Sequence, residues 1–226
     1  MTASLPILAA GFLLGWSVAW PPGPINAEIA RRCAAGQFWS GVAVLAGAAS
    51  ADALWAVAVA LGVGLLFAAP LARNAMGVVS VALLLALAFL FLRGAWRAFR
   101  KGDGPAAYRG LPARHGGEAR WKRAVRGGFG LGAAMALTSP WNVAFWLAAM
   151  GRPELAGARA DTLLAMAAVV LAGALTWGIL WAAANALLHR SLEGKAKRAW
   201  TIFVDLATGA LMLYFAAASA ARLMAA

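Results

Sequence analysis

The sequence predicts an all-α membrane protein whose six transmembrane helices form two inverted three-helix repeats, with the first and fourth helices broken. The chain of 226 residues is 63% hydrophobic and only 12% charged, a composition that excludes a soluble globular domain. Prolines interrupt two of the long apolar stretches, and most basic residues fall in alternate loops. Composition, helix breaks and loop charge together predict this fold class.

Six apolar stretches are long enough to cross a bilayer, which takes about 20 residues of helix. They run approximately over residues 5–29, 40–69, 75–92, 127–150, 162–188 and 200–221. We expect the first stretch to remain in the mature protein, since no Lys or Arg precedes its long apolar run.

The first span contains the run Pro22-Gly23-Pro24, with Asn26 two positions further on. Proline removes a backbone donor and clashes with the preceding turn, so this run breaks the helix. In hydrocarbon, the freed backbone groups need protein or water as partners, so a broken helix at membrane depth tends to line a cavity. Asn26 has both a donor and an acceptor, which suit either a substrate or the carbonyls that the prolines release.

The fourth span repeats this arrangement in Ser139-Pro140-Trp141-Asn142. Two interrupted helices in corresponding places of two halves are the best indication in a sequence of a transporter's substrate site. We therefore take both breaks as candidate substrate-binding segments. Trp141 is placed to stack over a substrate cation or to fill the interior of the bundle.

The basic residues separate by loop. Those on one side are Arg31, Arg32, Arg93, Arg97, Arg100, Lys101, Arg109, Arg114, Arg120, Lys122, Arg123, Arg126, Arg190, Lys195, Lys197 and Arg198, whereas the other side has Arg73, Arg152, Arg159 and Arg222. By the positive-inside rule the first set is cytoplasmic, which predicts both termini outside. The net charge of +12 is then explained by basic residues that lie against the anionic lipids of the inner leaflet, and no nucleic-acid partner is expected.

The chain divides into a first repeat (1–93), a basic cytoplasmic linker (94–126) and a second repeat (127–226). An odd number of spans per half requires the halves to be inverted. Gly15 matches Gly132 at an offset of 117, and Gly47 with Trp55 matches Gly173 with Trp181 at an offset of 126. These matches predict an inverted repeat, although the third and sixth spans align poorly.

Asp52 lies near the middle of the second span, where an ionised carboxylate costs about 2.5–3.5 kcal/mol. We expect it to couple transport to proton exchange or to bind a substrate amine, the alternative being a structural bond to the opened backbone. Glu28 is a second ionisable candidate, and its spacing to Arg31 and Arg32 fits a plain salt bridge equally well. Asp205 is expected to form a structural pair with Lys197 or Arg198.

No metal site, cofactor or catalytic set is expected. Cys33 is the only cysteine, which excludes a dithiol mechanism within one chain. His115 and His189 lie in or beside loops and form no ligand cluster, and no nucleophile has a base or paired acid in its span. The chain is therefore not predicted to be an enzyme.

At these residues the sequence resembles the lysine exporter (LysE) superfamily, in its LysE/RhtB amino-acid efflux branch. The resemblance rests on Pro22-Gly23-Pro24, Asn26, Gly36, Gly41, Gly47, Asp52, Gly62, Gly128-Phe129, Pro140 and Thr208-Gly209. Ala51 and Ser139 depart from it, standing where the family usually has Gly and Asn.

The resemblance implies a secondary transporter of the bacterial inner membrane that exports an amino acid or similar small metabolite, with a proton as coupling ion. A divalent cation exporter of the same superfamily is the alternative. A monomer suffices in principle, since both repeats are in one chain, and a homodimer is equally compatible.

Overall fold

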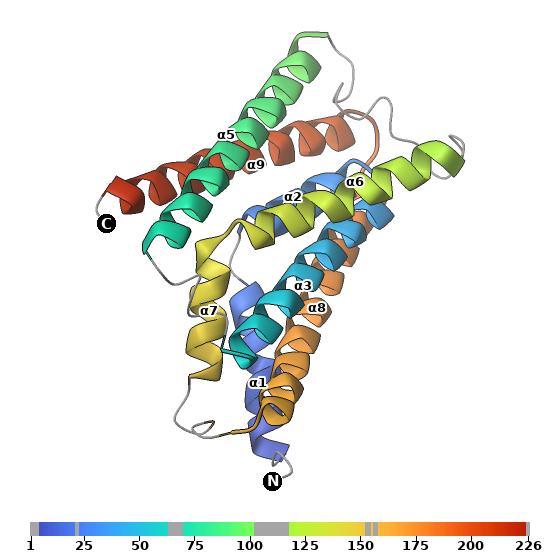
Figure 1. Ribbon diagram of the computed structural model, residues 1–226. Helices are drawn as coiled ribbons and strands as arrows, with labels where there is room; N and C mark the ends of the chain where they lie inside the picture. The colour runs from blue at the N-terminus through green and yellow to red at the C-terminus, as the bar shows by residue number, and fades with distance from the viewer. Residues whose placement is uncertain are drawn as a thin grey trace.

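The computed structural model describes residues 5–20, 23–62, 70–101, 118–151, 155 and 158–224, and these segments are almost wholly helical. The helices are α1 (Leu5–Ala19), α2 (Pro24–Ala34), α3 (Phe38–Ala60), α5 (Pro70–Lys101), α6 (Glu118–Leu137), α7 (Pro140–Met150), α8 (Ala160–Ser191) and α9 (Gly194–Met224). Figure 1 shows them as a bundle in which α5 and α9 cross beside the group formed by the other helices.

Four of the helices are long and apolar enough to cross a membrane: Phe38–Ala60, Gly77–Trp96, Ala160–Ser191 and Gly194–Ala221. The chain is therefore a multi-pass membrane protein. The expected spans at 5–29 and 127–150 are each divided into two shorter helices, α1 with α2 and α6 with α7.

Both breaks follow from local proline chemistry. Gly23, in extended conformation, precedes Pro24 at the start of α2, and Ser139, also extended, precedes Pro140 at the start of α7. Proline is well suited to the first position of a helix, because the N–H it lacks would have no intrahelical partner there. Each proline therefore ends one helix and starts the next, and Pro22 lies outside the described residues.

The long polar interval is more helical than its composition suggests. α5 continues to Lys101 and α6 begins at Glu118, so both ends of the 94–126 segment are helical and its Gly-rich middle lies outside the described residues. The turns that follow α2 and α8 are short. They use Gly36 and Gly194, whose φ angles of 79° and 50° favour a residue without a side chain.

α1 and α8 approach backbone to backbone. A Cβ atom on Gly15 would lie 1.8 Å from the carbonyl oxygen of Val170, and one on Gly173 would lie 2.1 Å from that of Phe12. Only glycine permits this separation, as is usual where helices pack closely in lipid. We call this contact the α1–α8 crossing.

α3 and α6 form a second contact of the same kind, the α3–α6 crossing. A Cβ atom on Gly47 would lie 2.0 Å from the carbonyl oxygen of Phe129, and one on Gly132 would lie 2.0 Å from that of Val44. Together with the contact between α3 and α8, the two crossings fix the helices that carry the breaks.

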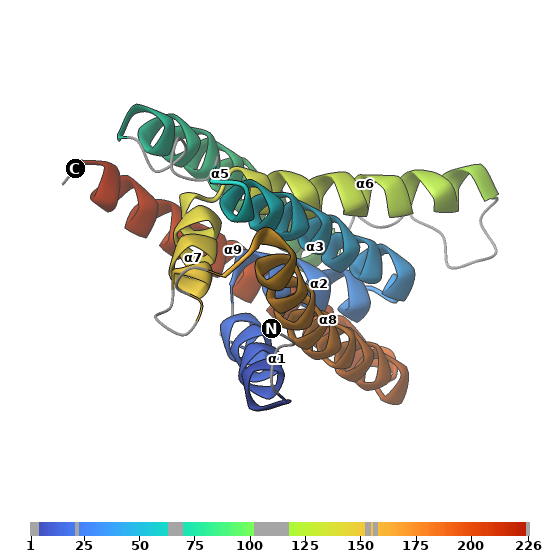
Figure 2. The same ribbon diagram turned by 60° about the horizontal axis from the view of Figure 1, so that its bottom comes forward.

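The half-helices leave their breaks in opposite directions. α2 runs toward the end of the molecule where α5 ends and α6 begins, whereas α7 runs toward the end that carries the N-terminus (Figure 1). Figure 2 shows α7 standing to the side of the crossed α3 and α8, between α1 and the last part of α9. The two breaks therefore face the same central region from opposite sides.

Candidate functional site

The two helix breaks line one pocket of about 620 Å³. Gly23, Pro24 and Asn26 contribute from the first break, and Ser139, Trp141 and Asn142 from the second. α3, α5, α8 and α9 supply the remaining walls. The structure thus brings together the two segments that the sequence singled out.

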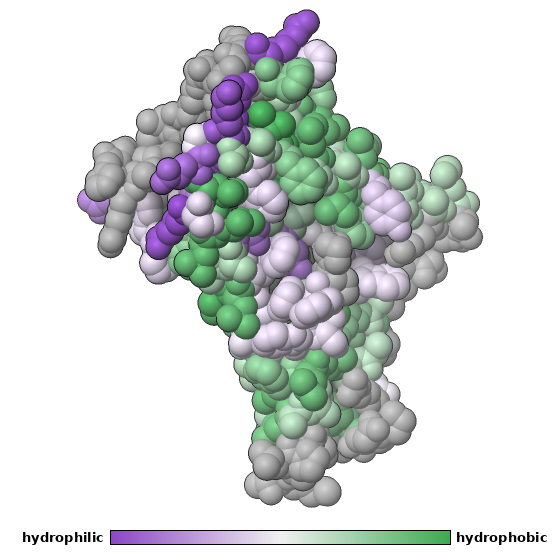
Figure 3. Space-filling model, turned by 180° about the vertical axis from the view of Figure 1, so that it is seen from behind, coloured by the Kyte–Doolittle hydropathy of each residue, from purple (hydrophilic) through white to green (hydrophobic). Residues whose placement is uncertain are grey.

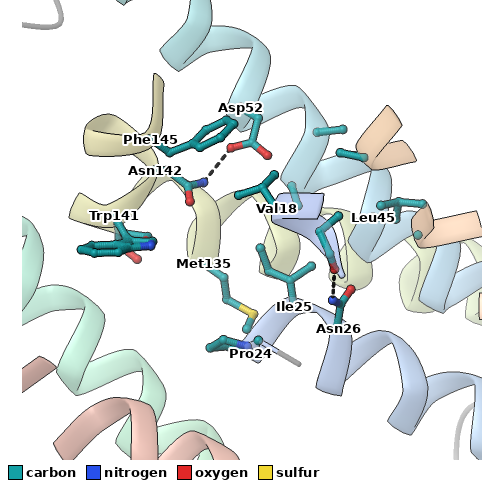
Figure 4. Close-up of a pocket in the computed structure, with 18 of the residues that line it drawn as sticks. Val18, Pro24, Ile25, Asn26, Leu45, Asp52, Met135, Trp141, Asn142 and Phe145 are labelled. Carbon is teal, nitrogen blue, oxygen red and sulfur yellow. Dashed lines mark hydrogen bonds between the residues drawn. The ribbon is translucent and has the colours of Figure 1, made fainter. Parts of the chain in front are cut away.

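At the first break, the side chain of Asn26 turns back to the end of α1. Its Nδ2 donates to the carbonyl oxygen of Ala19 at 2.6 Å, and Figure 4 draws this bond. The break at Pro24 removes an intrahelical donor from the end of α1, and the amide of Asn26 supplies a substitute.

The backbone carbonyl of Asn26 is also occupied, by a residue that sequence reasoning did not select. Trp181 of α8 donates its indole N–H to that oxygen at 2.9 Å. Trp181 stacks on Trp177, which in turn lies against Trp20 at the end of α1. This aromatic group holds the first break against α8.

At the second break, the side chain of Asn142 points across to α3. Its Nδ2 donates to Oδ1 of Asp52 at 2.6 Å, and Figure 4 shows the pair beside Phe145, with Trp141 at the start of the same helix. Trp141 lines the pocket and is 66% exposed. Pro140 starts α7 and thereby aims Asn142 at the carboxylate.

Asp52 is the charged side chain of the pocket wall. Among the described residues that line the pocket, the others are apolar or carry amide, hydroxyl or indole groups. Trp146 lies against the same carboxyl group and is almost fully buried among apolar side chains. A carboxylate and an amide at one end of an otherwise neutral pocket can bind an ammonium group through charge and hydrogen bonds.

Four more residues that line the pocket carry hydroxyl groups. Ser17 and Thr138 lie at the ends of α1 and α6, and each donates to a carbonyl of its own helix. Ser80 of α5 and Ser219 of α9 line the pocket as well. No sequence signal pointed to these last two residues, because the third and sixth spans have no helix break and align poorly.

Glu28 lies outside this pocket, within a buried ion-pair cluster. Its carboxylate accepts hydrogen bonds from Nε and Nη2 of Arg31 and from Nε of Arg32, all at 2.6 Å. Asp205 of α9 lies 3.9 Å from Nη1 of Arg31. The structure therefore realises the salt bridge that was the alternative for Glu28, and places Asp205 near a cation of α2, a different helix from that of the expected Lys197 and Arg198.

Metal-ligand candidates do not gather within the described ranges: no three His, Cys, Asp or Glu side chains come together there. Cys33 is buried and reduced. His189 lies against the α2–α3 turn, where a Cβ on Gly36 would be 3.0 Å from its Nε2.

Comparison with known proteins shows the family of the chain. The family described as LysE type translocator matches residues 16–222. The chain is 30% identical over 210 residues to the chemotactic transduction protein ChpE of Pseudomonas aeruginosa, an alignment that covers 92% of this chain and 95% of the relative. No solved structure matches. A match that spans both helix breaks, Asp52 and the helices that enclose them shows that the chain belongs to the LysE type translocators, a family of transporters.

Proposed function

We propose that the chain is a secondary transporter that exports amino acids or related small metabolites across the bacterial inner membrane, by proton antiport. The hydrogen bond from Asn142 to Asp52 carries the proposal, because it joins an opened helix to a carboxylate within a span. The pocket around this pair is large enough for a small metabolite.

An amino acid fits the pocket with its two charged groups apart. Asp52, with the amide oxygen of Asn142, suits the ammonium group. The N-termini of α2 and α7 both lie at the pocket, and the partial positive charge of a helix N-terminus suits a carboxylate. Apolar residues such as Ile25, Leu45 and Phe145 are available for the side chain of the substrate.

Asp52 also serves the coupling ion in this proposal. An ionised carboxylate without a partner costs about 2.5–3.5 kcal/mol at the centre of a span, so Asp52 is held either by an ammonium group or by a proton. Binding of the substrate and binding of a proton then exclude each other at the same carboxylate, so a proton is taken up only after the substrate leaves. Antiport requires this mutual exclusion. We therefore assign the exchange of substrate for a proton to Asp52 and not to Glu28, because the carboxylate of Glu28 is paired with two arginines.

The two crossings support an inverted repeat. The offset of 117 relates α1 to α6, and the offset of 126 relates α3 to α8. By these offsets, Gly15 corresponds to Gly132 and Val170 corresponds to Val44. The contact of Gly15 with Val170 is thus equivalent to the contact of Gly132 with Val44. The other contact of each crossing converts in the same way. Each half thus places its first helix against the second helix of the other half, which is the arrangement expected if one half rocks against the other.

Charge supports the orientation. Most basic residues of the described helices lie where α2, α5 and α8 end and where α6 and α9 begin, whereas Arg73 and Arg222 lie at the opposite ends of α5 and α9. In the view of Figure 3, the most hydrophilic residues gather in the upper part of the molecule. We assign this end to the cytoplasm, with both termini outside, and expect it to lie against anionic lipids.

A metal exporter would need acids or histidines gathered in the spans, whereas the described residues that line the pocket include one carboxylate, that of Asp52. The relative's name attaches that protein to chemotactic transduction, which makes a sensory role for this chain a second candidate. In that role the pocket would bind the same small molecules without net export.

Export of labelled amino acids from loaded cells tests the proposal. We expect Asp52→Asn and Asn26→Ala to abolish or greatly slow the efflux of every responsive amino acid while the protein still inserts. The matched control is Asp161→Asn, which removes an exposed carboxylate at the start of α8. If both pocket variants export as fast as the unaltered chain, the site assignment is wrong. Binding without any export would favour the sensory role.

A further inference from the structure

α2 is enclosed along nearly its whole length. Every residue from Ala27 to Ala34 is buried, including three that carry charge. The helix packs against α3, α8 and α9, and it lies between the pocket and the positively charged end of the molecule. In this conformation it closes the pocket on that side.

Buried charges hold α2 in this position. Glu28, fully inaccessible to solvent, pairs with Arg31 and Arg32 of its own helix. Arg31 reaches toward Asp205 of α9, and its guanidinium lies 4.0 Å from the centre of the Phe91 ring of α5. The two acids and two bases balance, so the cluster is neutral as a whole.

Arg32 extends the cluster to two more helices. Its Nη1 donates to Oγ of Ser40 in α3, and that hydroxyl donates to the carbonyl oxygen of Ala124 in α6 at 3.0 Å. Thr208 of α9 adds a hydroxyl contact to the carbonyl of Ala27, at 3.4 Å. α2 is thereby tied to α3, α5, α6 and α9 at the same level.

α7, the corresponding half-helix of the second half, has no such enclosure. At the offset of 116 that aligns Pro24 with Pro140, Glu28 and Arg32 correspond to Ala144 and Ala148. Both alanines are exposed, although the opposite face of α7 packs through Val143 and Trp146. The same helical face is therefore covered in α2 and open in α7.

We propose that α2 and α7 are the two gates of the pocket, that the Glu28–Arg31–Arg32–Asp205 cluster is the seal of the α2 gate, and that this conformation has α2 closed and α7 open. In the opposite conformation α2 leaves α9 and α3, and the face of α7 that carries Ala144 and Ala148 becomes covered. The inference rests on the proposed transport function, since only a transporter needs both states.

The chemistry of the seal suits a two-state element. A buried pair that loses one partner leaves an uncompensated charge, which is strongly unfavourable. When α2 moves out, water enters with it and hydrates all four groups together. The charges are thus either paired or hydrated, and intermediate positions of α2 are disfavoured.

The chain contains its own reporter of this movement. Cys33, its only cysteine, is completely buried on α2, and its Sγ lies 2.7 Å from the place of a Cβ on Gly41 of α3. Its thiol becomes reactive only when α2 separates from α3. N-ethylmaleimide reaches both sides of the membrane when it is added to membrane fragments. The rate at which it labels Cys33 therefore measures how often the α2 gate opens.

The test compares two thiols in the full-length chain. Glu28→Gln should raise the labelling rate of Cys33 about tenfold, the change expected if the minor conformation rises from about 1% to about 10%. In a Cys33→Ser background, the thiol introduced by Ala144→Cys should be labelled readily, and adding Glu28→Gln should slow it. A thiol introduced by Lys195→Cys, exposed at the start of α9, should keep its rate.

Thr208→Val provides the second test, because it removes the α2–α9 hydroxyl contact and leaves the ion pairs in place. As with Glu28→Gln, the labelling rate of Cys33 should rise and that of the thiol introduced by Ala144→Cys should fall, each by a smaller factor. If the two thiols rise together, or if neither changes, α2 is a fixed structural helix and the proposal is overturned. Labelling does not depend on cargo, so reciprocal rates combined with failed amino-acid export would refute the proposed substrate and leave the gates intact.

Discussion

Asn142 donates to Asp52 at 2.6 Å across the pocket, joining residues 90 positions apart in the chain. Asn142 belongs to the half-helix that Pro140 starts, and Asp52 to an unbroken span. The break at Pro140 thus directs an amide toward a carboxylate within a span, and this pair makes one part of the pocket polar. The pocket is asymmetric because the position in α8 that corresponds to Asp52 is Gly178.

Removing the amide of Asn142 should weaken substrate binding more than it weakens the fold. Asn142→Ala removes the amide that donates to Asp52, and losing a partner of a buried polar group costs about 1–3 kcal/mol. We expect the KM for efflux to rise at least about fivefold, since 1 kcal/mol corresponds to that factor. Asn185→Ala is the matched control, because Asn185 is also buried but bonds its own helix at Trp181. Equal KM values for the two variants would contradict a role of Asn142 in binding.

The indole N–H of Trp181 should position the first break. Trp181→Phe retains the aromatic stack and loses the donor to the carbonyl of Asn26, a bond worth about 1 kcal/mol. Efflux should slow several-fold while the Tm of the purified protein changes little. Trp177→Phe is the control within the same stack, because the buried Nε1 of Trp177 has no hydrogen-bond partner. The account is contradicted if both changes slow efflux to the same extent.

The crossings should tolerate no side chain. Gly47→Ala or Gly132→Ala forces α3 and α6 apart, and we expect Tm in detergent to fall by roughly 3–10 °C, since overpacking costs about 1–3 kcal/mol and each kcal/mol shifts Tm by about 2–4 °C. Gly130→Ala, on the same helix with open space around it, should leave Tm unchanged. An unchanged Tm for Gly47→Ala would show that the close approach is wrong.

Deleting the shared acid of the seal should destabilise the chain far more than deleting an exposed acid. Glu28→Ala leaves two buried guanidinium groups without their carboxylate, a loss of about 3–5 kcal/mol for a broken buried pair. Glu118→Ala, whose partner Lys122 is largely exposed, should cost less than about 1 kcal/mol. Thermal unfolding of the purified variants measures the difference, and comparable Tm values would refute the burial of the cluster.

Local chemistry explains what the sequence predicted well. Pro24 and Pro140 determine where their helices break whatever surrounds them, because a missing N–H and a fixed φ act within a single turn. The breaks, the pocket that they share and the placement of Asp52 could therefore be anticipated. Long apolar stretches likewise identify a membrane protein, since backbone groups in lipid must bond within their own segment.

Tertiary contacts explain what the sequence left open. Whether Asn26 served a substrate or its own backbone could not be decided from residue type, because an amide suits both, and the bond to Ala19 depends on how α1 ends. The proximity of Arg31 to Asp205 depends on α2 packing against α9, for which no spacing rule exists. Ser80 and Ser219 reach the pocket only through the crossing of α5 and α9.

Efflux from proteoliposomes under an imposed pH gradient tests most directly the claim that Asp52 exchanges substrate for a proton. With a responsive amino acid loaded inside, a pH gradient should accelerate efflux by the unaltered chain. Asp52→Asn, which binds neither proton nor ammonium group, should show no acceleration, whereas Asp161→Asn should behave as the unaltered chain does. Equal acceleration in the Asp52→Asn variant would contradict the account.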